Sequence, residues 1–173
     1  MRVSRTIVFA LRHHPDRFNL TMTEDGWVEI SQLRAEFEKA GHPFSEADLM
    51  LMVAEDDKSR LAVKDGWIRA NQGHTIPVDL KLPILTPPKF LLHGTVEKHL
   101  ASIMRQGLLK GSRHAVHLTE SAETAGKAAG RRGEPLLLRV SSGLMQAEGF
   151  EFSRSENGVW LVETVPPKFL LCI

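Results

Sequence analysis

The most informative stretch of this sequence is Lys64-Asp65-Gly66-Trp67-Ile68-Arg69-Ala70-Asn71-Gln72-Gly73-His74-Thr75. Its Asp65-Gly66 step predicts the tight turn of a β-hairpin whose strands run over residues 61–63 and 67–70. After the second strand, an arginine, two amides, a histidine and a hydroxyl surround Gly73, and this composition is suited to holding an anion. The alternative is a polar loop whose side chains cap their own backbone.

Three short helices are predicted before this hairpin. Ser4 can cap the first helix, and the second runs over residues 31–39. Ser45 and Asp48 form a capping-box-like start for the third helix. Helices followed by a hairpin suggest a small winged-helix domain, to which we assign residues 1–76.

The composition changes at residue 77 to Pro, Leu and Lys without an amphipathic period, which predicts a linker over residues 77–86. The second domain, residues 87–173, is predicted to be mixed α/β with a mainly β core, so that the whole chain is α+β. Its expected helices are 97–106 and 122–129, and its expected strands are 90–92, 115–118, 136–140, 158–162 and 168–171. A buried strand is expected to end in Leu92-His93-Gly94-Thr95, where the chain enters a helix.

One hexapeptide, Pro-Pro-Lys-Phe-Leu-Leu, occurs at both 87–92 and 166–171. Two strands that are each entered through a rigid Pro-Pro step would explain the repeat, and chance similarity is the other interpretation.

Charge and composition exclude several classes of protein. The net charge is only +1, with 11 basic and 13 acidic residues in 1–86 against 11 and 8 in 87–173, so any contact with nucleic acid must be local and directed at phosphate. The lone Cys172 cannot form an internal disulfide, and no metal-ligand spacing or long apolar run occurs. We expect a metal-free cytoplasmic protein without a membrane span. Walker A, dinucleotide-binding and nucleophile-elbow motifs are absent.

Several polar clusters could carry chemistry. Arg12 and His13 end the first helix, where they either complement its dipole or face the same groove as Arg69 and bind one phosphate. His93, beside a glycine that permits close backbone approach, and His117 lie near strand ends, where such a histidine is either structural or part of a binding site. A further basic cluster, Lys127, Arg131 and Arg132, is either a solvated helix end or a phosphate contact.

Five short motifs occur in order: Leu11-Arg12-His13, Arg69-Ala70-Asn71-Gln72-Gly73-His74, His93-Gly94-Thr95, Val116-His117-Leu118 and Glu156-Asn157-Gly158-Val159-Trp160-Leu161. With them the chain resembles the KptA-type RNA 2′-phosphotransferases over residues 4–170. The resemblance implies an N-terminal winged-helix lobe and a C-terminal ADP-ribosyltransferase-like lobe that binds NAD+. It also implies removal of an internal RNA 2′-phosphate, as in tRNA splicing, through attack of that phosphate on NAD+ and release of nicotinamide and ADP-ribose 1″,2″-cyclic phosphate.

Site residues are implied by the same resemblance. The catalytic set falls on Arg12, His13, Arg69 and Arg131, with Arg132 as the competitor for the fourth place. The expected NAD+ contacts are His93, Gly94, Thr95, His117, Leu118, Thr119, Asn157, Gly158 and Val159. The expected contacts to the substrate phosphate are Arg12, Arg69, Asn71, Gln72, His74 and Arg132. The expected partners are NAD+ and an RNA with an internal 2′-phosphate, with tRNA as one candidate, and we expect a monomer.

Two other functions compete with this one. An ADP-ribosyltransferase that stops after the first step would modify terminal phosphates of RNA or DNA. A non-catalytic winged-helix nucleic-acid-binding protein is disfavoured by the near-neutral charge and by the chemically active residues in both halves.

Overall fold

The structure, a computed structural model, describes residues 3–173. The chain divides into two compact units, Met1–Lys81 and Leu82–Ile173, and each has its own hydrophobic core. Within the described residues, six α-helices accompany four small antiparallel sheets, so the chain is a mixed α/β protein. No helix of residues 3–173 has the length and apolar character needed to cross a membrane.

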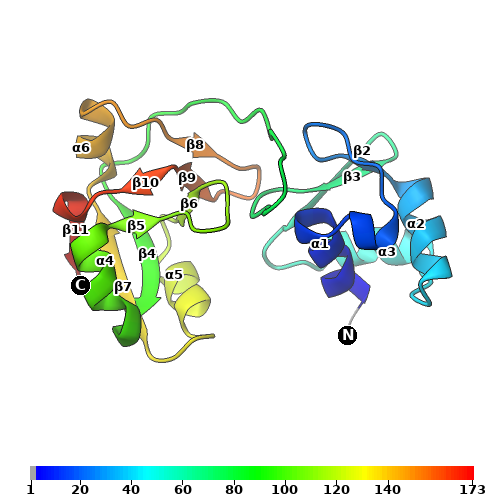
Figure 1. The fold of residues 1–173 in the computed structure, drawn as a ribbon, viewed down its shortest axis with the longest axis horizontal. Helices are drawn as coiled ribbons and strands as arrows, with labels where there is room; N and C mark the ends of the chain where they lie inside the picture. Colours follow the sequence, from blue (N-terminus) through cyan, green and yellow to red (C-terminus); the bar gives the residue numbers. More distant parts are fainter. Residues whose placement is uncertain (1–2) are drawn as a thin grey trace. The chain divides into compact units, whose positions relative to one another are not determined.

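Unit 1 combines three α-helices, one 3₁₀ turn and a three-stranded sheet of order β1-β3-β2 (Figure 1). Its elements are α1 (Val3–His13), η1 (Asp16–Phe18), β1 (Val28–Glu29), α2 (Ile30–Lys39), α3 (Glu46–Ala54), β2 (Leu61–Lys64) and β3 (Trp67–Ala70). The three predicted helices and the hairpin are confirmed, but Ser4 is not the cap of the first helix, because α1 already includes Val3 and Ser4 lies within it.

Local signals explain these elements. The Ser45 hydroxyl accepts a hydrogen bond from the Asp48 amide at 3.1 Å, and the Asp48 carboxylate accepts one from the Ser45 amide at 2.8 Å, which completes a capping box at the start of α3. Asp65 and Gly66 both have positive φ, +49° and +82°, as a two-residue hairpin turn requires.

The core of unit 1 lies between the helices and one face of the sheet. Ile68 and Ala70 of β3 point into it and are fully buried. The helices contribute Ile7, Leu11, Leu33, Phe37 and Leu49. Because side chains alternate along a strand, Trp67 and Arg69 lie on the opposite, outer face of the same strand.

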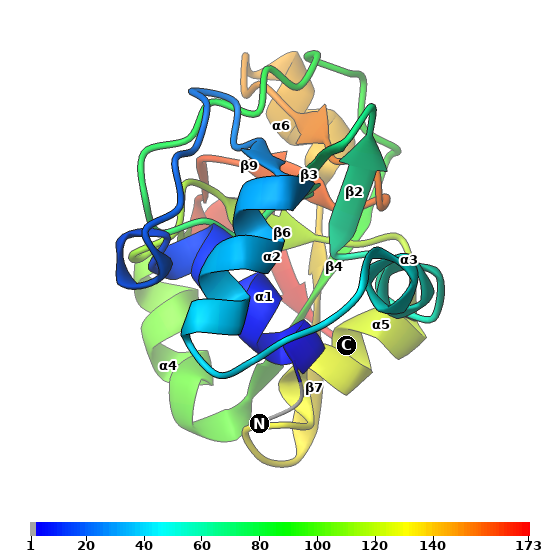
Figure 2. The ribbon, with the colours of Figure 1, turned by 90° about the vertical axis from the view of Figure 1, so that its right-hand side faces the viewer.

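In unit 2, three α-helices accompany a core formed mainly by strands. Its elements are β4 (Leu91–Val96), α4 (Glu97–Gln106), β5 (Leu108–Leu109), β6 (Val116–Leu118), α5 (Ala122–Ala129), β7 (Pro135–Val140), α6 (Ser142–Ala147), β8 (Ser153–Arg154), β9 (Trp160–Val162), β10 (Thr164–Val165), η2 (Pro167–Phe169) and β11 (Leu170–Cys172). Their sheet orders are β11-β7-β4, β6-β9-β8 and β10-β5. Helix α5 contacts β4 and β7, and all three can be followed in Figure 2.

Some sequence predictions for this unit are wrong in detail. The expected exit from a strand at His93–Thr95 does not occur, because β4 continues to Val96 through six pairs with β7. Lys168 and Phe169 belong to the 3₁₀ turn η2, and strand β9 starts at Trp160, two residues after Gly158. The β4 boundary depends on its pairing with β7, which is distant in sequence.

The repeated hexapeptide has a structural counterpart. Both copies lead into a strand, and the strands flank β7 in the same register, with Leu91 and Leu170 both opposite Val140. The next leucines, Leu92 and Leu171, are both opposite Arg139. The two copies therefore occupy matching positions on the two edges of one central strand.

Candidate functional site

The C-terminal end of α1 meets the loop that follows β3. The Thr75 amide donates to the Arg12 carbonyl at 3.0 Å, and His13 Nδ1 and Thr75 Oγ1 share a hydrogen bond of 2.9 Å. A Cβ added to Gly73 would lie 3.4 Å from the guanidinium carbon of Arg12, so this guanidinium packs on the glycine. Arg12, His13 and the loop thus form one cluster, although 62 residues separate His13 from Thr75.

Arg69 is held on the outer face of β3. Its side chain is on the same side of the strand as Trp67, and its guanidinium carbon lies 4.6 Å from the centre of the Trp27 ring. Nη1 also donates to the Asp25 carbonyl at 3.3 Å. The residue is only 8% exposed, so these contacts fix the direction of a largely buried cation.

Gly26 lies between the residues that hold Arg69 and approaches the loop that contacts Arg12. It lies between Asp25 and Trp27, the residues that hold Arg69, and a Cβ built on it would be 3.7 Å from His74 Nε2. His74 in turn sits between Gly73 and Thr75, which contact Arg12 and His13. Arg12 and His13 therefore contact the loop 73–75 directly, and the segment 25–27 that holds Arg69 approaches the same loop at His74.

Asn71 and His74, both expected at the phosphate, are deeply buried, with 5% and 2% of their surfaces exposed. The Asn71 side-chain amide donates to the Ser59 carbonyl at 2.7 Å, and its backbone amide donates to the Arg60 carbonyl at 2.9 Å. These bonds tie the start of the loop to the segment before β2. Gln72 and Gly73 are more accessible and lie half-buried at the turn of the loop.

In unit 2, the expected cofactor residues gather where β4 adjoins β6. Leu92 and Thr119 exchange two backbone hydrogen bonds of 2.8 and 3.0 Å, which join the two strands. Next to this bridge, His93 Nδ1 donates to the His117 carbonyl at 3.0 Å. His93, His117 and Thr119 are thereby brought together from positions up to 26 residues apart in the sequence.

The other expected residues of this group differ in accessibility. Leu118 is 1% exposed and belongs to the core, so it can offer a ligand only its main chain. Thr95 is also buried, and Thr119 accepts a hydrogen bond from the Ser121 amide just before α5. Asn157, Gly158 and Val159 form a tight turn, in which Ser155 Oγ donates to Asn157 Oδ1 and the Gly158 amide donates to the Ser155 carbonyl.

Gly94 has a definite packing role. A Cβ on this residue would lie 1.9 Å from the Ala125 carbonyl oxygen and 3.1 Å from the Ala129 Cβ. The backbone that approaches Gly94 is therefore that of helix α5, which docks on β4 at this point.

A pair of arginines surrounds the histidines. Arg113 Nη1 lies 3.5 Å from His117 Nδ1, and the positive charge of Arg132 is close enough to Arg113 and His93 to act on both. Within residues 3–173, no carboxylate lies within ion-pair distance of either Arg113 or Arg132. The site is thus electropositive and suited to an anionic ligand.

The surroundings of His93 favour its neutral form. Burial lowers its pKa, the charges of Arg132 and Arg113 lower it further, and the hydrogen bond to His117 opposes these effects. Because Nδ1 carries the donated proton, Nε2 is an acceptor. Burial, followed by the charge of Arg132, also lowers the pKa of Arg113.

Sequence reasoning missed Arg113. The available signal was its position four residues before His117, in the polar turn that leads into β6. Sequence reasoning also left the choice between Arg131 and Arg132 open; of the two, Arg132 is the one whose charge acts on His93. No group of three or more His, Cys, Asp or Glu residues in the described part of the chain could hold a metal ion.

Comparison with known proteins yields one consistent result. The family model described as RNA 2'-phosphotransferase, Tpt1 / KptA family matches residues 1–164. A protein of Streptomyces coelicolor called "Probable RNA 2'-phosphotransferase" is 46% identical over 170 residues, which are 98% of this chain and 93% of that protein. Proteins with the same name from Acaryochloris marina and Burkholderia pseudomallei are 44% and 42% identical over 98% of this chain and 94% and 93% of their own lengths.

Proposed function

Because this chain belongs to the RNA 2′-phosphotransferase, Tpt1 / KptA family, its activity is that of an RNA 2′-phosphotransferase, and we propose that NAD+ receives the phosphate. The observation that carries this proposal is the family match, which extends across both units of the chain. The expected products are 2′-OH RNA, nicotinamide and ADP-ribose 1″,2″-cyclic phosphate.

We assign the RNA phosphate to unit 1, as a winged-helix lobe. The succession of α1, β1, α2, α3, β2 and β3, with sheet order β1-β3-β2, supports this assignment. Arg12 and His13 at loop 73–75, together with Arg69, supply fixed donors for one phosphate group. Asn71 ties the start of that loop to Ser59, His74 is buried within it, and Gln72 is its half-buried amide.

We assign NAD+ to unit 2, as an ADP-ribosyltransferase-like lobe. Its residues fit such a ligand, because two guanidiniums without a carboxylate partner suit a pyrophosphate, and a neutral His93 offers an acceptor to a ribose hydroxyl. His117 and Thr119 adjoin His93, and Arg113 joins the set expected from sequence. NAD+ supplies a ribose carbon that accepts the phosphate oxygen as nicotinamide leaves.

The residues of this chain then act mainly by positioning and by electrostatics. A phosphate is already anionic, so it needs no strong base to attack, and Arg12 and His13 aim it. The second stage builds negative charge on phosphorus, which Arg69 stabilises, and the family resemblance implies Arg131 as the fourth catalytic residue. The hydrogen bond with Thr75 orients His13 for aiming the attacking phosphate.

An ADP-ribosyltransferase acting on terminal phosphates is the second candidate, since it would share the first stage. A non-catalytic nucleic-acid-binding protein is disfavoured by membership of a transferase family. We propose RNA with an internal 2′-phosphate, such as spliced tRNA, as the substrate, and a monomeric cytoplasmic enzyme. The exposed lone Cys172 is compatible with a reducing compartment.

One experiment separates these candidates. The protein is incubated with NAD+ and an oligoribonucleotide with one internal 2′-phosphate, while nicotinamide and RNA products are followed. A 2′-phosphotransferase releases nicotinamide and converts the RNA to the 2′-OH form. Matched RNAs with only a terminal phosphate, or with no 2′-phosphate, should be unreactive; stable ADP-ribosylation of the terminal phosphate would favour the second candidate.

A further inference from the structure

One surface of unit 1 places side chains with no assigned role next to Arg69 of the phosphate site. It is the outer face of the β1-β3-β2 sheet, opposite the core residues Ile68 and Ala70. Trp67 stands there beside Lys64, its partner across the hairpin, and two residues before Arg69. The outer face therefore combines one indole, one ammonium and one guanidinium on neighbouring strand positions.

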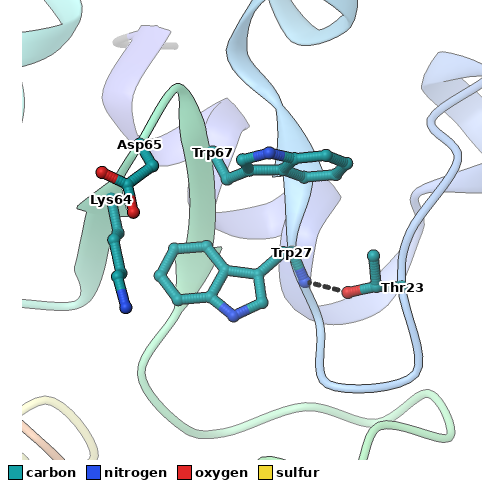
Figure 3. Close-up of a pocket in the computed structure, with 5 residues that line it drawn as sticks. All are labelled: Thr23, Trp27, Lys64, Asp65 and Trp67. Carbon is teal, nitrogen blue, oxygen red and sulfur yellow. Dashed lines mark hydrogen bonds between the residues drawn. The ribbon is translucent and has the colours of Figure 1, made fainter.

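A pocket of about 310 Å³ opens on this face and is lined by Thr23, Trp27, Lys64, Asp65 and Trp67. Figure 3 shows the two indoles bordering the same hollow, Trp27 from the segment before β1 and Trp67 from β3, with the Lys64 side chain extending along one side. Its volume lies at the lower end of about 300–1,000 Å³ for small-molecule sites, which suits one planar ring system.

The walls are held in place. The Trp27 amide donates to Thr23 Oγ1 at 2.9 Å, and the Arg69 guanidinium covers the Trp27 ring at 4.6 Å from its centre. The backbone of Trp67 is held in the sheet, with Glu29 opposite it on β1 and Lys64 opposite it on β2. The ordered Trp27 ring and the fixed backbone at Trp67 reduce the ordering that binding of a ligand requires.

Polar groups surround the two indoles at the edge of the pocket. Lys64 is exposed, and no carboxylate within residues 3–173 lies within ion-pair distance of its ammonium. Asp65 and Thr23 offer acceptor oxygens beside the indoles. Flat aromatic walls, one cation and a few acceptors are the groups that bind a nucleobase attached to a phosphate backbone.

We propose that this pocket, which we call the tryptophan pocket, binds an unpaired nucleobase of the RNA next to its 2′-phosphate. The inference rests on the proposed function, in which Arg69 contacts that phosphate. Arg69 packs against Trp27, so a phosphate on this guanidinium lies within one nucleotide of the pocket. The base stacks on the indoles, and Lys64 contacts a backbone phosphate.

The test compares Trp67→Ala with the native protein on two RNAs. Both carry one internal 2′-phosphate, and the second has abasic riboses on either side of that position. Stacking of one base is worth about 5- to 140-fold in affinity, so Trp67→Ala should raise KM for the first RNA by that factor and leave kcat and KM for NAD+ nearly unchanged. On the abasic RNA the two proteins should be equal. Trp67→Phe should restore most of the affinity, because it keeps an aromatic face.

The controls separate three outcomes. Circular dichroism and thermal unfolding establish that Trp67→Ala is folded. If the native protein releases no nicotinamide with either RNA, the proposed function fails. If the native protein is active and Trp67→Ala has an unchanged KM for the first RNA, or loses affinity equally for both RNAs, the nucleobase site is refuted while the proposed function stands.

Discussion

Replacing Gly94 by alanine tests the packing of unit 2 in a quantitative way. The added Cβ would lie 1.9 Å from the Ala125 carbonyl oxygen, and carbon-to-oxygen contacts normally begin near about 3.3 Å, so α5 would have to move by roughly 1.4 Å. Because the obstacle is helix backbone, no side-chain rotation relieves the overlap. Overpacking of this kind costs about 1–3 kcal/mol, and we expect a value near the upper limit.

The expected result is a large fall in thermal stability. Near 3 kcal/mol corresponds to a decrease in Tm of about 12–24 °C for a unit of this size, measured by differential scanning calorimetry. The matched control is Gly126→Ala in α5 itself, where a Cβ meets nothing within 4 Å. That change should stabilise the helix by about 1 kcal/mol and raise the Tm.

The outcome separates two roles for Gly94. If Gly94→Ala keeps the native Tm and loses only NAD+ use, the glycine serves approach of the ligand and the packing argument is refuted. A lower Tm with a parallel loss of NAD+ use supports docking of α5. The larger Gly94→Val change is less informative about the cofactor, because it would disrupt the unit as a whole.

Three further predictions concern the proposed site. Arg69→Ala should slow completion of the transfer by about 10²–10³ and accumulate RNA with ADP-ribose on its 2′-phosphate, which rapid quench and a denaturing gel detect; an equal slowing of nicotinamide release without that intermediate would contradict the assignment. Because the folded-state pKa of His93 is lowered, the stabilising contribution of this residue should be complete above about pH 6.5 and be lost as pH falls towards the folded-state pKa. The difference in free energy of unfolding between the native protein and His93→Gln should therefore shrink on acidification. A constant difference in denaturant titrations from about pH 7.5 to about pH 5 would refute this prediction. Arg132→Ala should raise the pKa of His93 in an NMR titration, whereas Arg131→Ala should leave that pKa unchanged and lower kcat. The opposite pattern would mean that the roles assigned to the two arginines must be exchanged.

Sequence reasoning succeeded where the determinants are local. The capping residues before α3, the turn at Asp65-Gly66 and the glycine that ends α4 each act within a few residues, and the corresponding elements lie where they were predicted. The short strands β1, β5, β8 and β10 were not predicted. Each has only two residues, and its existence depends on a partner strand elsewhere in the chain.

The same distinction applies to the candidate site. The motifs identified Arg12, His13, Arg69, His93 and His117 as candidates, but no pattern could show that Thr75 bonds His13 or that Trp27 supports Arg69. Arg113 was missed because its significance comes from the charges around it, which depend on the tertiary fold. The sequence predicted that another group approaches the backbone at Gly94, but it did not identify that group as helix α5.

The duplicated hexapeptide creates a problem of strand choice during folding. Two segments with identical sequence can compete for either edge of β7, since Leu91 and Leu170 pair with the same residue. The residues after the two copies differ: Gly94 lies opposite Leu137 on one edge, and Ile173 donates its amide to the Leu137 carbonyl on the other. An isoleucine in the place of Gly94 would collide with the Ala125 carbonyl. Helix α5 can therefore pack only on the strand whose hexapeptide copy is followed by the glycine, so its docking distinguishes the two otherwise identical segments.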